Sequence, residues 1–128
     1  MTSTPRQLVI PTLRMTDETS SRAFYVEGLG FHVDWAHRFE PGLPALMQLT
    51  RDGMTFYLSQ HVMDRALGGL LRLFVDRVDE WHAELRRRSI AIELPPTDQP
   101  WGLREMHLVD PDGNRLRICT RLSGRSQR

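Results

Sequence analysis

Apolar and polar residues alternate along four short segments of the chain, residues 8–15, 54–59, 70–75 and 114–119. Successive side chains of a β-strand point to opposite sides, so this period of two predicts strands. One set of alternate positions is uniformly apolar and is expected to pack beneath helices: Val9, Pro11, Leu13, Met15, Met54, Phe56, Leu58, Leu71, Leu73, Val75, Leu116 and Ile118. The other set mixes apolar, hydroxyl and guanidinium groups, which suits either a ligand cavity or a face left in water: Ile10, Thr12, Arg14, Thr55, Tyr57, Ser59, Leu70, Arg72, Phe74, Arg115, Arg117 and Cys119.

Helical patterns follow two of these strands, at residues 18–27 and 77–88. Thr16 or Asp17 is placed to cap the first helix, and Asp76 is placed to cap the second. Three apolar residues of the second segment keep helical spacing, so they are expected in the core rather than in a binding site: Val78, Trp81 and Leu85.

The order of these elements repeats along the chain. The Asp52-Gly53 turn recurs sixty residues later as Asp112-Gly113, and strands and helices recur at the same offset. We therefore expect one domain, residues 1–128, made of two copies of strand, helix and three strands at about residues 8–60 and 68–120. Residues 122–128 are expected to form a disordered tail.

Composition narrows the class of protein. The chain has 128 residues, of which 40% are hydrophobic, enough for a single packed core. Its net charge of +1 does not favour a nucleic-acid partner, and no apolar run is long enough for a membrane span. The single cysteine, Cys119, excludes an internal disulfide and favours a reducing compartment. We expect a cytoplasmic protein without a signal peptide and without nucleic-acid or membrane partners.

Three segments carry a resemblance to a known family: residues 14–31, residues 74–85, and PWGLREMHLVDPDGNRLRI at residues 100–118. With them, residues 8–120 resemble the vicinal-oxygen-chelate superfamily, which includes glyoxalases, bleomycin-resistance proteins and dioxygenases. The resemblance implies an α+β fold in which two paired βαβββ modules form a cupped mixed β-sheet with the helices outside. It also implies a homodimer whose clefts hold a small molecule.

Enzymes of this superfamily hold a divalent metal with four inward side chains. By motif position, these side chains correspond here to Ile10, Tyr57, Leu70 and Arg117. Ile10 and Leu70 have no donor atoms, Arg117 is a permanent cation, and tyrosine is a rare metal ligand. The sequence therefore disfavours a metal site of the usual kind, and we expect no cofactor.

The chain is most similar to the metal-free bleomycin-resistance proteins, which sequester a drug without chemistry. The resemblance rests on PWG followed by RE, at residues 100–105, and on VDWAHRFEPGLP at residues 33–44. Aromatic side chains would stack on a flat ligand, and arginines would bind acidic groups. The predicted ligand-binding residues are Trp35, His37, Phe39, Tyr57, Arg72, Trp101, His107 and Arg117.

Several alternatives stay open at this point. The ligand is either a bleomycin-type drug or an anionic or aromatic metabolite, since the chain is near neutral whereas drug-binding members are usually acidic. Arg117 either binds ligand beside Arg72 or lies on the surface. A lyase-like or dioxygenase-like enzyme with an atypical metal site is the alternative function, as is acid–base catalysis by His107 with Tyr57. A dimeric scaffold without a small ligand is a third possibility.

Overall fold

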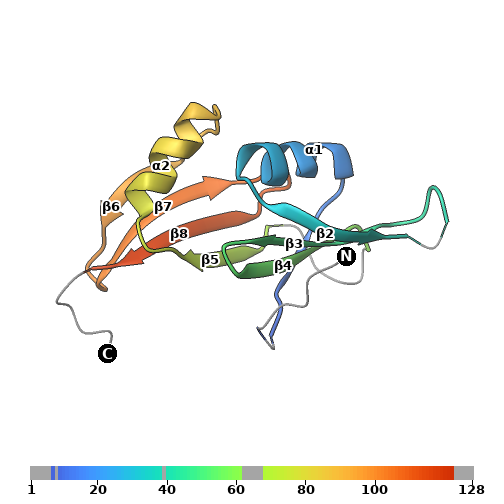
Figure 1. Ribbon diagram of the computed structural model, residues 1–128, viewed down its shortest axis with the longest axis horizontal. Coiled ribbons are helices and arrows are strands. Elements are labelled where there is room, and N and C mark those ends of the chain that lie inside the picture. The colour runs from blue at the N-terminus through green and yellow to red at the C-terminus, as the bar shows by residue number, and fades with distance from the viewer. Residues whose placement is uncertain (1–6, 8, 39, 62–67, 123–128) are drawn as a thin grey trace.

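The computed structural model describes residues 7, 9–38, 40–61 and 68–122, and shows eleven helices and strands in those ranges (Figure 1). The first half contains β1 (Thr12–Arg14), α1 (Glu18–Arg22), the π-helix η1 (Ala23–Gly28), β2 (His32–His37), β3 (Leu46–Arg51) and β4 (Met54–Ser59). The second half contains β5 (Leu70–Phe74), α2 (Val78–Arg87), β6 (Leu94–Asp98), β7 (Leu103–Val109) and β8 (Arg115–Arg121). None of the helices described is long and apolar enough to cross a membrane.

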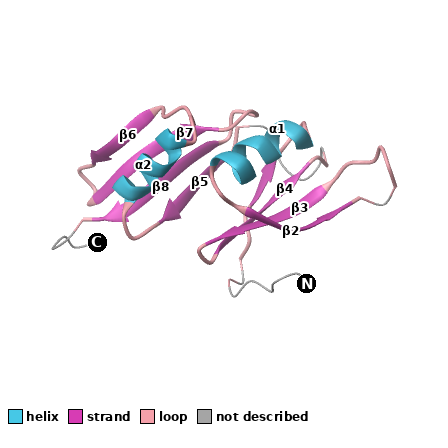
Figure 2. Cartoon of the chain, turned by 45° about the horizontal axis from the view of Figure 1, so that its top comes forward, coloured by secondary structure: helices cyan, strands magenta, loops and turns pink. Residues whose placement is uncertain are grey.

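Each half forms its own four-stranded mixed sheet, in the order β1-β4-β3-β2 and β5-β8-β7-β6. The first strand of each half runs parallel to the last, and the other neighbours are antiparallel. The helices of both halves cover the same side of the two sheets (Figures 1 and 2). The predicted α+β fold with two βαβββ modules is confirmed, with the strands divided between two sheets.

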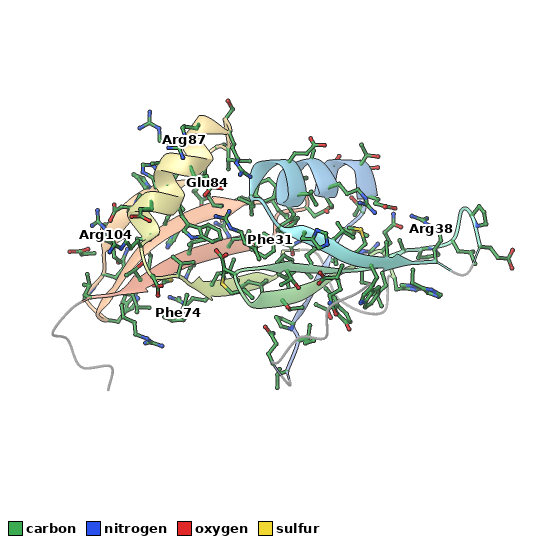
Figure 3. All side chains as sticks on the ribbon, viewed as in Figure 1. Phe31, Arg38, Phe74, Glu84, Arg87 and Arg104 are labelled. Atoms are coloured by element: carbon green, nitrogen blue, oxygen red, sulfur yellow. The ribbon has the colours of Figure 1, made fainter. Side chains whose placement is uncertain are left out.

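The apolar set of strand positions forms most of a continuous core beneath the helices. Leu13, Phe56 and Ile118 are almost fully buried, as the alternation predicts. Phe31 lies in this core, whereas Phe74 projects from β5 on the side away from the helices (Figure 3). The prediction for Val9 is wrong: it is 83% exposed, because β1 begins only at Thr12 and Val9 precedes the paired part of the strand.

The first helix begins as predicted, with the Asp17 carboxylate accepting the backbone N–H of Ser20 at 2.8 Å. It continues past Arg22 as the π-helix η1 rather than as the α-helix that the sequence pattern indicates. Gly28 ends η1 against the second module. A Cβ atom at Gly28 would lie 2.3 Å from Cδ1 of Ile90, so any larger residue would have to displace the Ile90 side chain.

The second helix lies close to its predicted position, with Val78, Trp81 and Leu85 buried. The predicted cap by Asp76 is wrong, because the residue at the cap position is Arg77 and its side chain makes no capping bond. The N–H of Val78 instead donates to Oγ1 of Thr120 at 2.8 Å. A hydroxyl from β8, distant in sequence, thus supplies the cap and fixes α2 to its sheet.

The turn after β7 fastens the second module to the first. The buried hydroxyl of Tyr25 donates to the Asp110 carboxylate at 2.6 Å, and Asn114 donates to the same carboxylate through its backbone and side-chain nitrogens at 2.9 Å. Asn114 also donates to the carbonyl of Arg14 and accepts from the N–H of Gly69, both at 2.8 Å. The DPDGN motif therefore acts as a junction between the ends of β1, β5 and β7.

Arg51 makes a second link between the modules. Its guanidinium donates to the carbonyl of Leu29 at 2.6 Å and to the Glu84 carboxylate on α2 at 2.8 Å. The same group lies 3.8 Å from the ring centroid of Trp81. The hydrogen bond from Arg51 lowers the pKa of Glu84 despite the opposing effect of burial. The interface between the modules is thus held by charge-assisted bonds as well as by apolar packing.

We expect Tyr25→Phe to lower the free energy of unfolding by about 1–2 kcal/mol, because Asp110 loses a buried hydrogen bond while the ring packing is kept. Urea denaturation of the purified protein measures this change. Tyr57→Phe is the matched control, since the described residues offer the Tyr57 hydroxyl no hydrogen-bond partner. Equal losses in the two variants would contradict a clamping role for Tyr25.

Candidate functional site

Four of the predicted site residues gather on the second sheet, on the side away from the helices, which we call the open face. Arg117 lies in the middle on β8, with Arg72 of β5 as its register partner on one side and His107 of β7 on the other. Leu116 and Ile118 point to the opposite side and are buried in the core. The alternation seen in the sequence thus places the cations of β8 on the open face.

A buried carboxylate, Glu105 on β7, organises this cluster. Its side chain is fully buried and accepts hydrogen bonds from Nε1 of Trp101 at 2.7 Å, from Nε2 of His107 at 3.0 Å, and from the guanidinium of Arg72. Burial raises the pKa of Glu105, but the hydrogen bonds from His107, Trp101 and Arg72 outweigh that effect and hold the pKa below its ordinary value. Glu105 is therefore an anion that fixes three neighbouring side chains. We call these four residues the Glu105 cluster.

Trp101 lies in the tight turn that joins β6 to β7. Gly102 has a φ of 86°, a conformation that favours glycine, and its N–H donates to the carbonyl of Gln99 at 3.1 Å. The indole is fixed at Nε1 by Glu105, yet Trp101 is 54% exposed. The PWG motif followed by RE thus presents an aromatic ring whose orientation is set before any ligand arrives.

The two arginines of β8 have different surroundings. Arg115 donates to the Glu93 carboxylate at 3.0 Å and is exposed. Arg117 is half-buried, and no hydrogen bond or ion pair to its guanidinium is found in the described part of the chain. Of the two interpretations that the sequence allows, the register of Arg117 beside Arg72 favours a cation available to a ligand.

Cys119 lies beneath this cluster and is buried. Burial raises the pKa of its thiol to about 11, and the nearby Glu105 carboxylate acts in the same direction. The thiol is consequently protonated near neutral pH. Arg72 also lies 3.8 Å from its sulfur. These surroundings suit a structural role for Cys119 rather than a nucleophilic one.

Two other predicted residues meet on the first sheet. The rings of Trp35 on β2 and Tyr57 on β4 make an edge-to-face contact, with centroids 5.2 Å apart. His37 lies at the exposed end of β2, and Phe39 lies outside the described residues. The candidates therefore divide into an aromatic pair on the first sheet and the charged group around Glu105 on the second.

The four family metal positions do not make a metal site. Ile10 and Leu70 offer no donor atom, Tyr57 packs against Trp35, and Arg117 carries a fixed positive charge. Within the residues that the structure describes, no three histidine, cysteine, aspartate or glutamate side chains group as metal ligands. The donor set at these positions does not fit the divalent metal that the superfamily uses.

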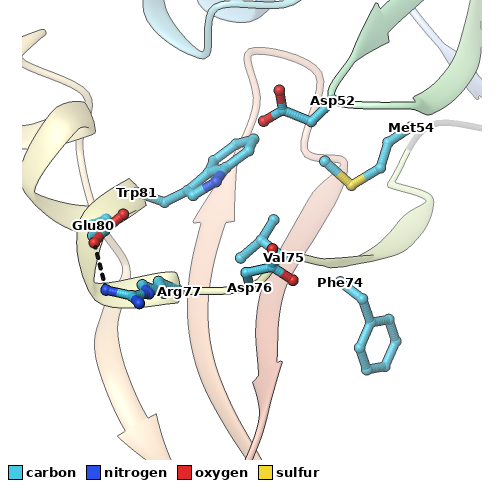
Figure 4. Close-up of a pocket in the computed structure, with 8 residues that line it drawn as sticks. All are labelled: Asp52, Met54, Phe74, Val75, Asp76, Arg77, Glu80 and Trp81. Atoms are coloured by element: carbon cyan, nitrogen blue, oxygen red, sulfur yellow. Dashed lines mark hydrogen bonds and ion pairs between the residues drawn. The ribbon is translucent and has the colours of Figure 1, made fainter.

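A pocket of about 480 Å³ opens between the β3–β4 turn and the start of α2 (Figure 4). Its lining residues are Asp52, Met54, Phe74, Val75, Asp76, Arg77, Glu80 and Trp81, none of which the sequence predicts as a ligand contact. A smaller pocket of about 150 Å³ lies between the modules and includes Arg72. Neither of these two pockets includes Trp101, His107 or Arg117.

The sequence analysis did not include Glu105 among the site residues, although the cluster centres on it. Trp101 and His107 lie four and two residues from Glu105, but Arg72 is 33 residues away on β5, and the sequence does not show that the three side chains converge on one carboxylate. The feature of the sequence that could have identified Glu105 is its position on the strand. Glu105 shares a face of β7 with Leu103 and His107, and two of these three residues are buried, Glu105 completely.

We expect Glu105→Gln to lower the free energy of unfolding by about 2 kcal/mol at neutral pH, since hydrogen bonds to a buried charge are weakened. The pKa of Glu105 is lower in the folded protein than its ordinary value of 4.5. The carboxylate's contribution is therefore complete above that value and is lost as the pH falls through the folded-state pKa. Urea unfolding of both proteins at pH 7 and pH 3 should show a smaller difference at pH 3.

Glu93→Gln is the matched control, because Glu93 pairs with Arg115 where both side chains are about half exposed. Its effect at pH 7 is expected within about 0.5 kcal/mol, as for surface ion pairs. Other carboxyls with lowered pKa values, such as Glu84, contribute to every protein in the comparison. A Glu105→Gln variant as stable as Glu93→Gln at pH 7 would show that the cluster does not support the fold.

Comparisons with known proteins agree with this architecture. A family model described as glyoxalase superfamily protein matches residues 3–125. The solved bleomycin-binding protein complexed with bleomycin is 27% identical, with a TM-score of 0.71 over 89% of this chain and 98% of that chain. A glyoxalase/bleomycin resistance protein from Streptomyces sp. CB03234 is 26% identical, with a TM-score of 0.67 over 85% of this chain and 96% of that chain.

A third solved structure is TnmS3, an antibiotic binding protein from Streptomyces sp. CB03234, which shares the fold at 24% identity. Its TM-score is 0.71 over 91% of this chain and 98% of that chain. No curated protein sequence gives a significant match. The family match spans nearly the whole sequence and accords with the two βαβββ modules, and the chain therefore belongs to the glyoxalase superfamily.

Proposed function

We propose that this protein sequesters a small molecule in the manner of a bleomycin-resistance protein, without metal and without chemical change. The observation that carries the proposal is Trp101, a half-exposed indole held from behind by the buried Glu105 carboxylate. A ring held in place before binding loses little conformational entropy when a flat ligand stacks on it. The likeness to a bleomycin-binding protein at 27% identity supports the same class of function.

The proposal places the ligand in a cleft of a homodimer, as the family resemblance implies. Trp101 is 54% exposed in the single chain, so a second wall would be needed to enclose a ligand against its ring. The ring pair of Trp35 and Tyr57 is suited to supply that wall from the other copy. The dimer and a cytoplasmic location stay predictions.

The residues at the four family metal positions fit metal-free binding of a ligand better than they fit metal-dependent catalysis. The positions that hold the metal in family enzymes carry Ile10, Leu70, Tyr57 and Arg117 here, and two of these have no donor atom. A divalent ion beside the fixed cation Arg117 would be repelled. The proposed ligand therefore binds through contacts with side chains, without a metal ion.

One contact favours a second candidate function, an enzyme that uses acid–base catalysis. Nε2 of His107 lies 3.0 Å from Oε1 of Glu105, a carboxylate–histidine pair of the kind that orients a general base. Tyr57, the partner expected for His107 from the sequence, contacts Trp35 on the other sheet instead. Turnover of a metabolite by the wild type, lost in His107→Ala, would favour this alternative.

The proposal predicts saturable binding of bleomycin to metal-stripped protein, with one drug molecule per cleft. Isothermal titration calorimetry measures the affinity, and mass spectrometry of the recovered drug checks that its mass is unchanged. Trp101→Ala should weaken binding at least about tenfold, because the stacking area of the indole is lost. His82→Ala, on the helix side, is the control and should bind as the wild type does. Absence of binding would contradict a bleomycin-type ligand, and a chemically changed drug would contradict sequestration.

A further inference from the structure

The ring of Trp101 and the cations of the open face lie within reach of one small ligand. Nε1 of Trp101 and the guanidinium of Arg72 both donate to the same oxygen of Glu105, Oε2, so the indole edge and this guanidinium are immediate neighbours. Arg72 is in turn the register partner of Arg117 on the adjacent strand. A stacking surface in the β6–β7 turn and two guanidinium groups, on β5 and β8, therefore share the open face.

These two guanidinium groups differ in how their charge is balanced. Arg72 is paired with the buried Glu105 carboxylate. Arg117 has no such partner within the described residues, whereas Arg115 on the same strand is paired with Glu93. Of the three arginines Arg72, Arg115 and Arg117, only Arg117 has no carboxylate partner among the described residues.

We infer that the site is built for a planar aromatic monoanion, whose ring stacks on Trp101 and whose carboxylate binds the guanidinium of Arg117. This inference rests on the proposed binding function and names the class of its ligand. A guanidinium presents forked donors that match the two oxygens of a carboxylate. The remaining fixed cation, Arg72, is neutralised by Glu105, so a second negative charge on the ligand meets no partner.

Glu105 acts here as a positioning residue that also sets the charge of the ligand. Glu105→Gln keeps an oxygen that can accept from Trp101, but it removes the negative charge that balances Arg72. The variant would then present two adjacent cations, Arg72 and Arg117, on neighbouring strands. Its preference is expected to move from a monoanion to a dianion, which loss of stability alone would not produce.

The first test compares two probes of the same shape, 2-naphthoate and the neutral 2-naphthamide, by calorimetric titration of the full-length protein. The wild type should bind the carboxylate at least about fivefold more tightly than the amide. Arg117→Ala should abolish this preference while leaving the affinity for the amide within about twofold. Arg115→Ala is the matched control, on the same strand but paired with Glu93, and should keep the preference.

The second test uses naphthalene-2,3-dicarboxylate, whose two carboxylates are adjacent. The wild type should bind it no more tightly than 2-naphthoate, whereas Glu105→Gln should bind it at least about fivefold more tightly than 2-naphthoate. An unchanged preference in Glu105→Gln would overturn the role of this residue in setting the ligand charge. Circular dichroism and the affinity for 2-naphthamide check that the variant keeps its fold and its aromatic site.

The outcome for bleomycin separates this inference from the proposed function. If bleomycin or 2-naphthamide binds while 2-naphthoate binds no better than the amide, sequestration stands and the inference of an anionic ligand is wrong. A preference for the carboxylate that is retained in Arg117→Ala would likewise overturn the role assigned to Arg117. If bleomycin and all three naphthalene probes fail to bind, both the proposed function and the inference fail.

Discussion

The buried carboxylate of Asp110 is the contact on which the arrangement of the two modules depends. It accepts hydrogen bonds from the Tyr25 hydroxyl of the first module and from the backbone and side chain of Asn114 in the second. A buried charge of this kind is tolerated only when its lone pairs are satisfied, so the turn cannot move independently of η1. Because that turn joins β7 to β8, it also places the hairpin that carries the candidate site.

The same hairpin carries a second buried carboxylate with hydrogen-bond partners, that of Glu105, and its role differs from that of Asp110. Asp110 joins structural elements, whereas Glu105 fixes side chains that end on the open face, including the half-exposed indole of Trp101. Glu105 and Asp110 are only five residues apart on and after β7. The junction at Asp110 therefore also helps to fix the position of the proposed binding surface. The buried carboxylate of Glu105 thus holds side chains of different elements in place on one side of a sheet.

Much of the fold follows from local patterns, and the failures have identifiable causes. The alternation of apolar and polar residues correctly predicts that Phe56 and Ile118 lie in the core, because successive side chains of a strand point to opposite faces of the sheet. The predicted cap of α2 is wrong because Thr120, distant in sequence, supplies the acceptor oxygen in place of Asp76. Within the site, Trp101 is identifiable from its motif, but the centre of the cluster, Glu105, is not. Its partners converge only once the second module has folded.

The central claim is that a small molecule binds at Trp101, and the three tryptophans of the chain allow a direct test. Trp101 reports on the Glu105 cluster, Trp35 on the open face of the first sheet, and Trp81 on the pocket beside α2. The measurement is the indole N–H region of a two-dimensional NMR spectrum of nitrogen-15-labelled protein, recorded during titration with 2-naphthoate. The account predicts a saturable shift of the Trp101 signal and a stationary Trp81 signal; a shift of Trp81 alone would contradict it.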